Sequence, residues 1–214
     1  MIHPPLIKFV GFDLDLTLYK ENRKIKKVFR DAFYALMASE FKIDYREAKK
    51  EFLKYSKTIS GACEIAKAMG IKDPERFAMQ ASAKSKIYLY LKRDERLFNL
   101  LRYLREKYIL FLITGSAETD ARLKLEKLGI NLENDFEYKI FGDSEKSGKF
   151  NGKSFSKLIK ITKGKPQEHL YVGDQDAHDI IPAKRVGMQT VMVWGQSKNA
   201  DLSLSTIYDL EKWL

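Results

Sequence analysis

The sequence predicts an α/β protein with a doubly wound, Rossmann-like parallel sheet and an inserted domain of four helices. From residue 94 onward, short apolar runs alternate with helical patterns. These runs are apolar throughout, which is typical of parallel strands buried on both faces. Residues 20–93 contain only helical patterns. We therefore expect an α/β core made of residues 1–19 and 94–214 and a helical domain made of residues 20–93, a size that 214 residues can support.

The first strand is expected at residues 6–12, "LIKFVGF", and the helical insert follows it. In residues 25–37, apolar side chains recur every three or four positions, which marks one face of a helix. Asp44 is a candidate N-cap for a helix over residues 45–57. A third helix is expected at residues 60–69, and Asp73 with Pro74 predicts the start of a fourth.

The rest of the chain alternates helices with strands. The expected helices are 94–107, 117–129, 153–164, 176–187 and 204–214, and the expected strands are 108–116, 137–142, 169–174 and 188–195.

Polar residues gather where three of these strands end, in "DLDLT" (13–17), "ITGS" (113–116) and "GDQDAHD" (173–179). Because ligands of open α/β sheets bind at the carboxyl ends of strands, the three segments should meet at one edge. Asp13, Asp15 and Asp174 would then form a carboxylate cluster. Like charges so close repel one another unless a cation lies among them. Hard oxygen ligands beside a phosphate suit Mg²⁺.

The chain resembles the haloacid dehalogenase-like (HAD) superfamily, in particular its phosphatases with a helical cap of the C1 type. The "DLDLT" segment matches the D-x-D-x-T motif of that superfamily, Thr114 matches its hydroxyl motif, and "VGDQDAHDI" matches its acidic motif through Asp174 and Asp179. One departure is Leu16, where the family often has Asn or Gly.

The resemblance implies a role for each matched residue. Asp13 would be the nucleophile that forms an aspartyl-phosphate, and Asp15 the general acid and base. Asp13, the backbone carbonyl of Asp15 and Asp174 would hold Mg²⁺, with Asp179 supporting the waters of the metal. Thr114 and the amide of Gly115 would bind the phosphoryl oxygens.

The family also requires a lysine that neutralises charge on the phosphoryl group. Two lysines are candidates. Lys149 has the expected spacing before Asp174 but lacks the neighbouring prolines that relatives carry. Lys153 lies at an expected helix start, as in other members of the family, and is slightly preferred.

An acid at position 15 favours a phosphomonoester as substrate, because dehalogenases and phosphonate-cleaving members of the superfamily lack it. We therefore expect a Mg²⁺-dependent phosphatase that acts on a small phosphorylated metabolite. Phosphoryl transfer to a second hydroxyl, as in phosphomutases, is an alternative within the same motifs.

The positive charge of the chain leaves a further alternative open. Residues 20–93 hold 19 Lys and Arg against 9 Asp and Glu, which accounts for the whole net charge of +10. Such a surface is often only a solvated helical face, but it could also bind nucleic acid, as in a polynucleotide end-phosphatase. One cysteine, no apolar run of membrane-spanning length and no secretory signal favour a cytoplasmic protein without a membrane partner, as a monomer or homodimer.

Overall fold

The protein is described by a computed structural model that covers residues 4–59, 61–144, 149 and 151–214. The chain divides into two compact units. The first contains residues 1–20 and 91–214 and the second residues 21–90. Each unit is described below by itself. No helix among the described residues combines the length and the apolar character that crossing a lipid bilayer requires.

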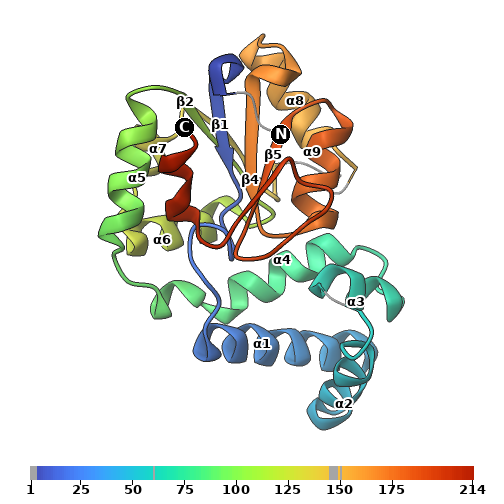
Figure 1. Ribbon diagram of the computed structural model, residues 1–214. Helices are drawn as coiled ribbons and strands as arrows, with labels where there is room; N and C mark the ends of the chain where they lie inside the picture. The colour runs from blue at the N-terminus through green and yellow to red at the C-terminus, as the bar shows by residue number, and fades with distance from the viewer. Residues whose placement is uncertain (1–3, 60, 145–148, 150) are drawn as a thin grey trace. The chain divides into compact units, whose positions relative to one another are not determined.

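The first unit is built on a six-stranded sheet in the order β3-β2-β1-β4-β5-β6, and all neighbouring strands are parallel. Figure 1 shows the central strands β1, β4 and β5 side by side. The strands are β1 (Phe9–Phe12), β2 (Ile109–Ile113), β3 (Tyr138–Ile140), β4 (His169–Gly173), β5 (Gln189–Val193) and β6 (Leu202–Leu204).

Helices cover both faces of this sheet, which explains why its neighbouring strands β1 and β2 contain no polar side chain. Figure 1 shows α5 on one side of the strands and α8 and α9 on the other. From β1 the chain adds β2 and β3 on one side, and it then crosses to the other side of β1 to add β4, β5 and β6. The direction of strand addition therefore reverses between β1 and β4. The helices of this unit are α5 (Glu95–Arg105), α6 (Glu118–Leu128), α7 (Leu132–Asp135), α8 (Lys153–Thr162) and α9 (Ile181–Arg185).

Gly11 in the central strand is required by close packing. Its neighbours in the register are Phe111 on β2 and Tyr171 on β4, whose rings stack with centroids 6.1 Å apart. A Cβ at residue 11 would lie 1.9 Å from the ring of Phe111. The absence of a side chain at this position therefore makes room for two aromatic rings, and Tyr171 contributes to the site described below.

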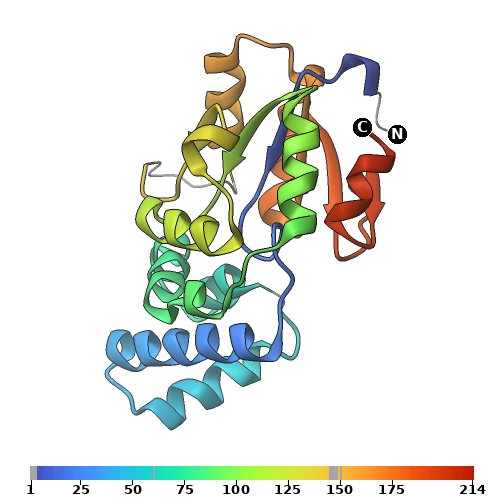
Figure 2. The same ribbon diagram turned by 90° about the vertical axis from the view of Figure 1, so that its left-hand side faces the viewer.

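The second unit consists of helices packed around their own apolar core. Its α helices are α1 (Arg23–Phe41), α2 (Tyr45–Tyr55), α3 (Ala62–Ala68) and α4 (Pro74–Ser85). Figure 2 shows α1 and α2 as the two blue helices of this unit. As predicted, Asp44 accepts a hydrogen bond from the amide of Glu47 and Asp73 caps α4 with Pro74 in the first turn. The core contains Phe33, Tyr34, Phe52 and Phe77, and further apolar side chains.

The predicted fold class, an α/β protein with an inserted helical segment, is confirmed. The helical unit, residues 21–90, lies within the segment 20–93 that was expected to form the inserted domain. Residue 60, the expected start of the third helix, lies outside the described residues.

Two short elements were missed. The strand β6 was not predicted, and neither was α7, because elements of three or four residues show no measurable periodicity. The expected helix 176–187 instead begins with a π-helical turn, Asp176–Ile180, followed by α9.

Candidate active site

Three carboxylates meet at the carboxyl edge of the central strands. Asp13 follows β1, Asp174 follows β4, and Asp179 lies in the π-helical turn after β4. Each offers a carboxylate oxygen, and these oxygens lie within 4.8 Å of one another. The point where the chain direction reverses in an open α/β sheet is where ligands bind, and β1 and β4 flank that point here.

One backbone and one side-chain hydrogen bond hold the first two of these aspartates at the strand ends. The amide of Asp13 donates to the carbonyl oxygen of Val172 at 2.9 Å and so extends the pairing of β1 with β4 by one residue. The hydroxyl of Thr17 donates to Oδ1 of Asp174 at 3.3 Å. The two loops after β1 and β4 are thereby linked to each other.

Lys149 lies at the centre of the acidic group. Its Nζ is 2.6 Å from Oδ1 of Asp13 and 2.6 Å from Oδ1 of Asp179. It also donates to the hydroxyl of Tyr171 at 3.2 Å, and that hydroxyl donates to the carbonyl oxygen of Ile113 at 2.7 Å. The amine is buried, so its charge is shared among groups from β1, β4 and the turn after β4.

Asp179 organises the turn that carries Asp174. Its Oδ2 accepts hydrogen bonds from the backbone amides of Asp174 at 3.2 Å and Gln175 at 3.0 Å. Gly173 makes this approach possible, because a Cβ there would lie 2.3 Å from the Cβ of Asp179. Both carboxylate oxygens of Asp179 thus contact groups of the protein, which agrees with a supporting role.

The electrostatics of this group favour a bound cation. Burial raises the pKa of Asp13 to about 7, and the carboxylates of Asp179 and Asp15 add to the effect while Lys149 opposes it. Burial and the charges of Asp179 and Asp13 raise the pKa of Asp174 well above its ordinary value. Although burial acts to lower the pKa of Lys149, Asp13 and Asp179 raise it well above the usual range, which keeps the amine charged.

The residues present fit a divalent metal ion. The three carboxylates outnumber the single ammonium of Lys149, and carboxylate oxygens are the ligands that Mg²⁺ prefers. A cation beside Asp13 and Asp174 would favour their ionised forms and so oppose the effects of burial and of carboxylate repulsion on their pKa values.

Asp15 lies next to this group, but other residues bind its carboxylate. Lys124 Nζ and the hydroxyl of Tyr19 donate to Oδ1 at 2.6 Å and 2.5 Å, and Ser116 donates to Oδ2 at 2.5 Å. Burial acts to raise the pKa of Asp15, but the charge of Lys124 and the hydrogen bonds from Lys124, Ser116 and Tyr19 lower it overall. A second, separate cluster therefore surrounds the predicted acid and base.

Thr114 and Gly115 lie at the end of β2, as the sequence predicted. The amide of Thr114 donates to the carbonyl oxygen of Ile140 at 3.0 Å, and its Oγ1 accepts from the amide of Ser116 at 3.1 Å. Thr114 is buried, whereas Gly115 is exposed and a Cβ there would meet no atom within 4 Å. Space for a ligand therefore exists at residue 115.

The preference for Lys153 over Lys149 does not agree with the geometry. Lys153 is the first residue of α8 and its side chain is exposed, while Lys149 lies against Asp13. The geometry therefore favours Lys149 as the candidate, and a catalytic role for either lysine stays a prediction.

Three further residues at the site were not predicted. Tyr171 belongs to an apolar strand, where an aromatic residue suggests only packing. Ser116 was named only as part of the "ITGS" segment, without a role of its own. Lys124 is a fully buried lysine, which is rare unless the charge is paired. The spacing of four residues between Ser116, Asp120 and Lys124 is the signal that could have grouped them, because it places Asp120 and Lys124 on one helix face.

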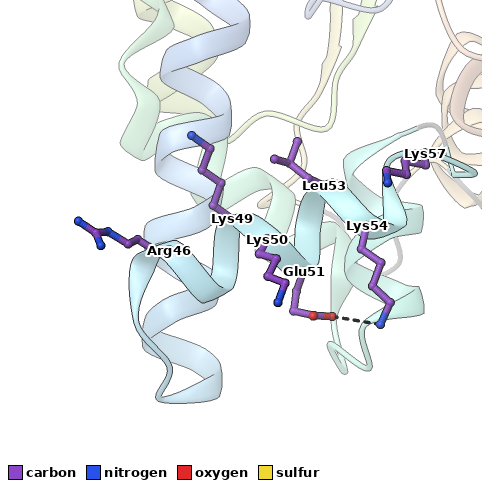
Figure 3. A pocket seen from close by; sticks show the side chains of 7 residues that line it. All are labelled: Arg46, Lys49, Lys50, Glu51, Leu53, Lys54 and Lys57. Atoms are coloured by element: carbon purple, nitrogen blue, oxygen red, sulfur yellow. Dashed lines mark ion pairs between the residues drawn. The ribbon is translucent and has the colours of Figure 1, made fainter.

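A separate hollow of about 610 Å³ lies on the helical unit along α2 (Figure 3). Its charged lining is basic except for Glu51, which pairs with Lys54 at 3.7 Å. None of the predicted catalytic residues lines it. The residues are Arg46, Lys49, Lys50, Glu51, Leu53, Lys54 and Lys57.

A sequence model described as haloacid dehalogenase-like hydrolase matches residues 10–193, which include both strand-end aspartates of the acidic group. The chain belongs to this family. The predicted resemblance is thereby confirmed, and so is the predicted enzyme class, a HAD-like hydrolase of the phosphatase type.

Two relatives show how far the similarity of this HAD-like hydrolase extends along the chain. A glyceraldehyde 3-phosphate phosphatase of Pyrococcus furiosus is 28% identical over an alignment of 216 residues. The alignment covers 92% of this chain and 85% of that protein. The enzyme of the same name from Methanopyrus kandleri is 28% identical over 198 residues, with coverage of 88% and 84%. The similarity therefore includes both units.

Solved structures share the fold. A HAD phosphatase from Thermococcus onnurineus superposes with a TM-score of 0.65 at 26% identity and covers 97% of each chain. A HAD-hydrolase from Bacillus subtilis, whose structure contains magnesium, has a TM-score of 0.63 at 15% identity and covers 97% of this chain and 98% of its own. At that identity the second structure shows the fold alone.

Proposed function

We propose that the protein is a Mg²⁺-dependent phosphomonoester hydrolase that acts on a small phosphorylated sugar or related metabolite through an aspartyl-phosphate. The observation that carries the proposal is the position of Asp13, which stands at the end of β1 between Lys149 and the carboxylate of Asp174. A carboxylate in this position can attack phosphorus while neighbouring positive charge reduces its repulsion from the phosphoryl oxygens.

Asp13, Asp174 and the backbone carbonyl of Asp15 would hold the metal, and Asp179 would orient the loop that carries Asp174. Bound Mg²⁺ supplies positive charge that stabilises the phosphoryl oxygens and the attacking carboxylate. Lys149 contributes further positive charge on the side of Asp13. Thr114 and the amide of Gly115 would bind the remaining phosphoryl oxygens.

The reaction then proceeds in two displacements. The negative charge of a bound phosphate would favour the protonated form of Asp15, which is the starting form in the first step. In that step, an oxygen of Asp13 forms a bond to phosphorus, the ester P–O bond breaks, and Asp15 gives its proton to the departing alcohol oxygen. In the second, Asp15 takes a proton from water, the water oxygen attacks phosphorus, and the bond to Asp13 breaks. The products are an alcohol and inorganic phosphate, and Asp13 and Asp15 return to their starting forms.

The substrate class is supported by the relatives. Both proteins reported above are named glyceraldehyde 3-phosphate phosphatases, and the similarity to each covers more than four fifths of both chains. We therefore propose short aliphatic sugar phosphates, with glyceraldehyde 3-phosphate as the first compound to test. The helical unit would serve as the cap that selects among them.

Nucleic acid is a less favoured substrate in this proposal. Binding to single strands relies on aromatic side chains that stack on bases. In the helical unit, Phe33, Tyr34, Phe52 and Phe77 are buried in the apolar core and cannot stack on a ligand, whereas Phe41, Tyr45 and Tyr90 are exposed.

The test is release of inorganic phosphate from glyceraldehyde 3-phosphate and from p-nitrophenyl phosphate by wild type and by Asp13→Asn. We expect Mg²⁺-dependent turnover by wild type and none by the variant. With ³²P-labelled substrate and acid quench, label should be trapped on wild-type protein at Asp13. Turnover by Asp13→Asn at the wild-type rate would contradict the proposal, and consumption of substrate without release of phosphate would indicate transfer to a second hydroxyl instead.

A further inference from the structure

Lys124 on α6 is completely buried, and its amine binds two acidic groups. Nζ lies 2.6 Å from Oδ1 of Asp15 and 2.7 Å from Oδ2 of Asp120, and it donates to Oγ of Ser116 at 3.0 Å. Asp15 and Ser116 come from the loops after β1 and β2, so Lys124 joins three segments of the first unit.

A lysine at this position is costly for the fold. The side of α6 that faces the core also carries Ala121, Leu125 and Leu128, all buried. An apolar side chain at residue 124 would continue that face, whereas an ammonium must give up its hydration. The fold alone therefore gives no reason for a lysine here, and its contact with Asp15 provides one.

The carboxylate of Asp15 is held at both oxygens. Lys124 and the hydroxyl of Tyr19 donate to Oδ1, and Ser116 donates to Oδ2. With three donors on two oxygens, rotation of the carboxylate about its last bond is restricted. A proton-transfer group must lie within hydrogen-bond reach of the oxygen that it serves, and small displacements of such groups reduce rates strongly.

We propose that Lys124 is a positioning residue that, together with Ser116 and Tyr19, fixes the carboxylate of Asp15 for proton transfer and thereby allows the enzyme to cleave aliphatic phosphate esters. This inference rests on the proposed function, because it takes Asp15 as the acid and base. An aliphatic alkoxide leaves slowly without a proton, whereas p-nitrophenolate leaves without one. Loss of Lys124 should therefore affect the two classes of ester differently.

The test compares wild type with Lys124→Met and with Lys127→Met, which replaces an exposed lysine on the same helix. For glyceraldehyde 3-phosphate, we expect kcat of Lys124→Met to fall by about 10²-fold or more, the contribution usual for a general acid or base. For p-nitrophenyl phosphate, the first step should proceed within about tenfold of the wild-type rate. Hydrolysis of the aspartyl-phosphate still needs Asp15, so stopped-flow traces should show a burst of one p-nitrophenol per active site followed by slow turnover. Lys127→Met should behave as wild type.

A merely structural role for Lys124 would give a different pattern. It would reduce the amplitude of the burst, and kcat for both substrates would fall by the same factor. That result would overturn the proposal. If Lys124→Met does not fold, Ser116→Ala is the second variant, because it removes one of the three donors to Asp15 without leaving a buried charge. For this variant, kcat should again fall more for the aliphatic ester than for p-nitrophenyl phosphate. Wild type without activity on either ester would refute the proposed function itself, whereas active wild type with an unaffected Lys124→Met would refute only this inference.

Discussion

The Nζ of Lys149 lies 2.6 Å from Oδ1 of Asp13, so the predicted nucleophile is in direct contact with a buried positive charge. The same amine contacts Asp179 and the hydroxyl of Tyr171, which holds it at the edge of the sheet. Lys153, the other lysine that sequence reasoning considered, lies exposed at the start of α8.

This difference in position between the two lysines predicts different outcomes for two matched substitutions. Lys149→Met removes a charge that would stabilise the phosphoryl oxygens in the transition state, and kcat should fall by about 10²–10³-fold, as for the loss of other such donors. Lys153→Met should keep kcat within about twofold of wild type. Steady-state kinetics with p-nitrophenyl phosphate at saturating Mg²⁺ provide the measurement. Equal losses in the two variants would show that Lys149 has no special role.

Metal binding should be visible in the thermal stability of the protein. A ligand that binds only the folded state at 100 times its Kd adds about 2.7 kcal/mol to the free energy of unfolding. For a chain of this size, that corresponds to a rise in Tm of roughly 5–10 °C.

Asp174→Asn should lose most of this rise, because it removes one carboxylate of the acidic group. Asp176→Asn is a suitable control, because Asp176 lies in the same turn but its Oδ1 accepts from Ser197. Differential scanning calorimetry with and without MgCl₂ is the measurement. A Mg²⁺-dependent rise that is unchanged in Asp174→Asn would place the metal elsewhere.

His169 should make stability depend on pH outside the site. Its ring is buried and stacks on the ring of Phe9, with the ring centroids 4.5 Å apart. Its Nδ1 donates a hydrogen bond to the carbonyl oxygen of Lys165. Burial lowers the pKa of His169 below its ordinary value of 6.5, although its backbone hydrogen bonds oppose the effect. The folded state therefore binds this proton less tightly than the unfolded state does, so stability must fall as the pH drops through about 6.5.

Urea unfolding between pH 8 and pH 5 checks this sign. As the pH falls, the free energy of unfolding of wild type should decrease more than that of His169→Phe. This variant keeps an aromatic ring beside Phe9 but does not titrate. His169→Asn should also lack the wild-type slope. Parallel pH profiles for all three proteins would mean that His169 titrates alike in the folded and unfolded states.

Leu16 adopts a left-handed backbone conformation, with φ at 62°. This conformation costs roughly 1–2 kcal/mol for a residue with a Cβ, and asparagine tolerates it better than leucine does. Leu16→Asn should therefore raise the free energy of unfolding by about 1 kcal/mol. Loss of the apolar contacts of the half-buried leucine would reduce this gain. Alanine lacks the short polar side chain with which asparagine hydrogen-bonds to the local backbone, so thermal unfolding should show no comparable gain for Leu16→Ala.

The sequence predicted the sheet and its acidic residues because both produce local signals. Continuous apolar runs between helices are visible in the chain, and each of Asp13, Thr114 and Asp174 directly follows such a run. The left-handed conformation of Leu16 also gives a physical reason why relatives often have Asn or Gly there.

The remaining parts of the site depend on contacts between segments that are distant in sequence. Lys149 belongs to no helix or strand, so no periodicity marks it, and only its spacing from Asp174 identified it as a candidate. Lys124 was missed because lysines on helices are normally exposed, and its burial follows from an aspartate 109 positions earlier in the chain. Tyr171 was assigned to packing, which is correct for its ring but omits its hydroxyl.

The order of the strands has a consequence for protein synthesis. Asp13 is synthesised before β4, the strand that pairs beside β1 and is followed by Asp174. An incomplete chain that ends before this strand cannot assemble the three carboxylates, however well its helical unit has already folded. Truncated products that lack β4 are therefore expected to be inert toward phosphate esters, even where their helical unit is folded.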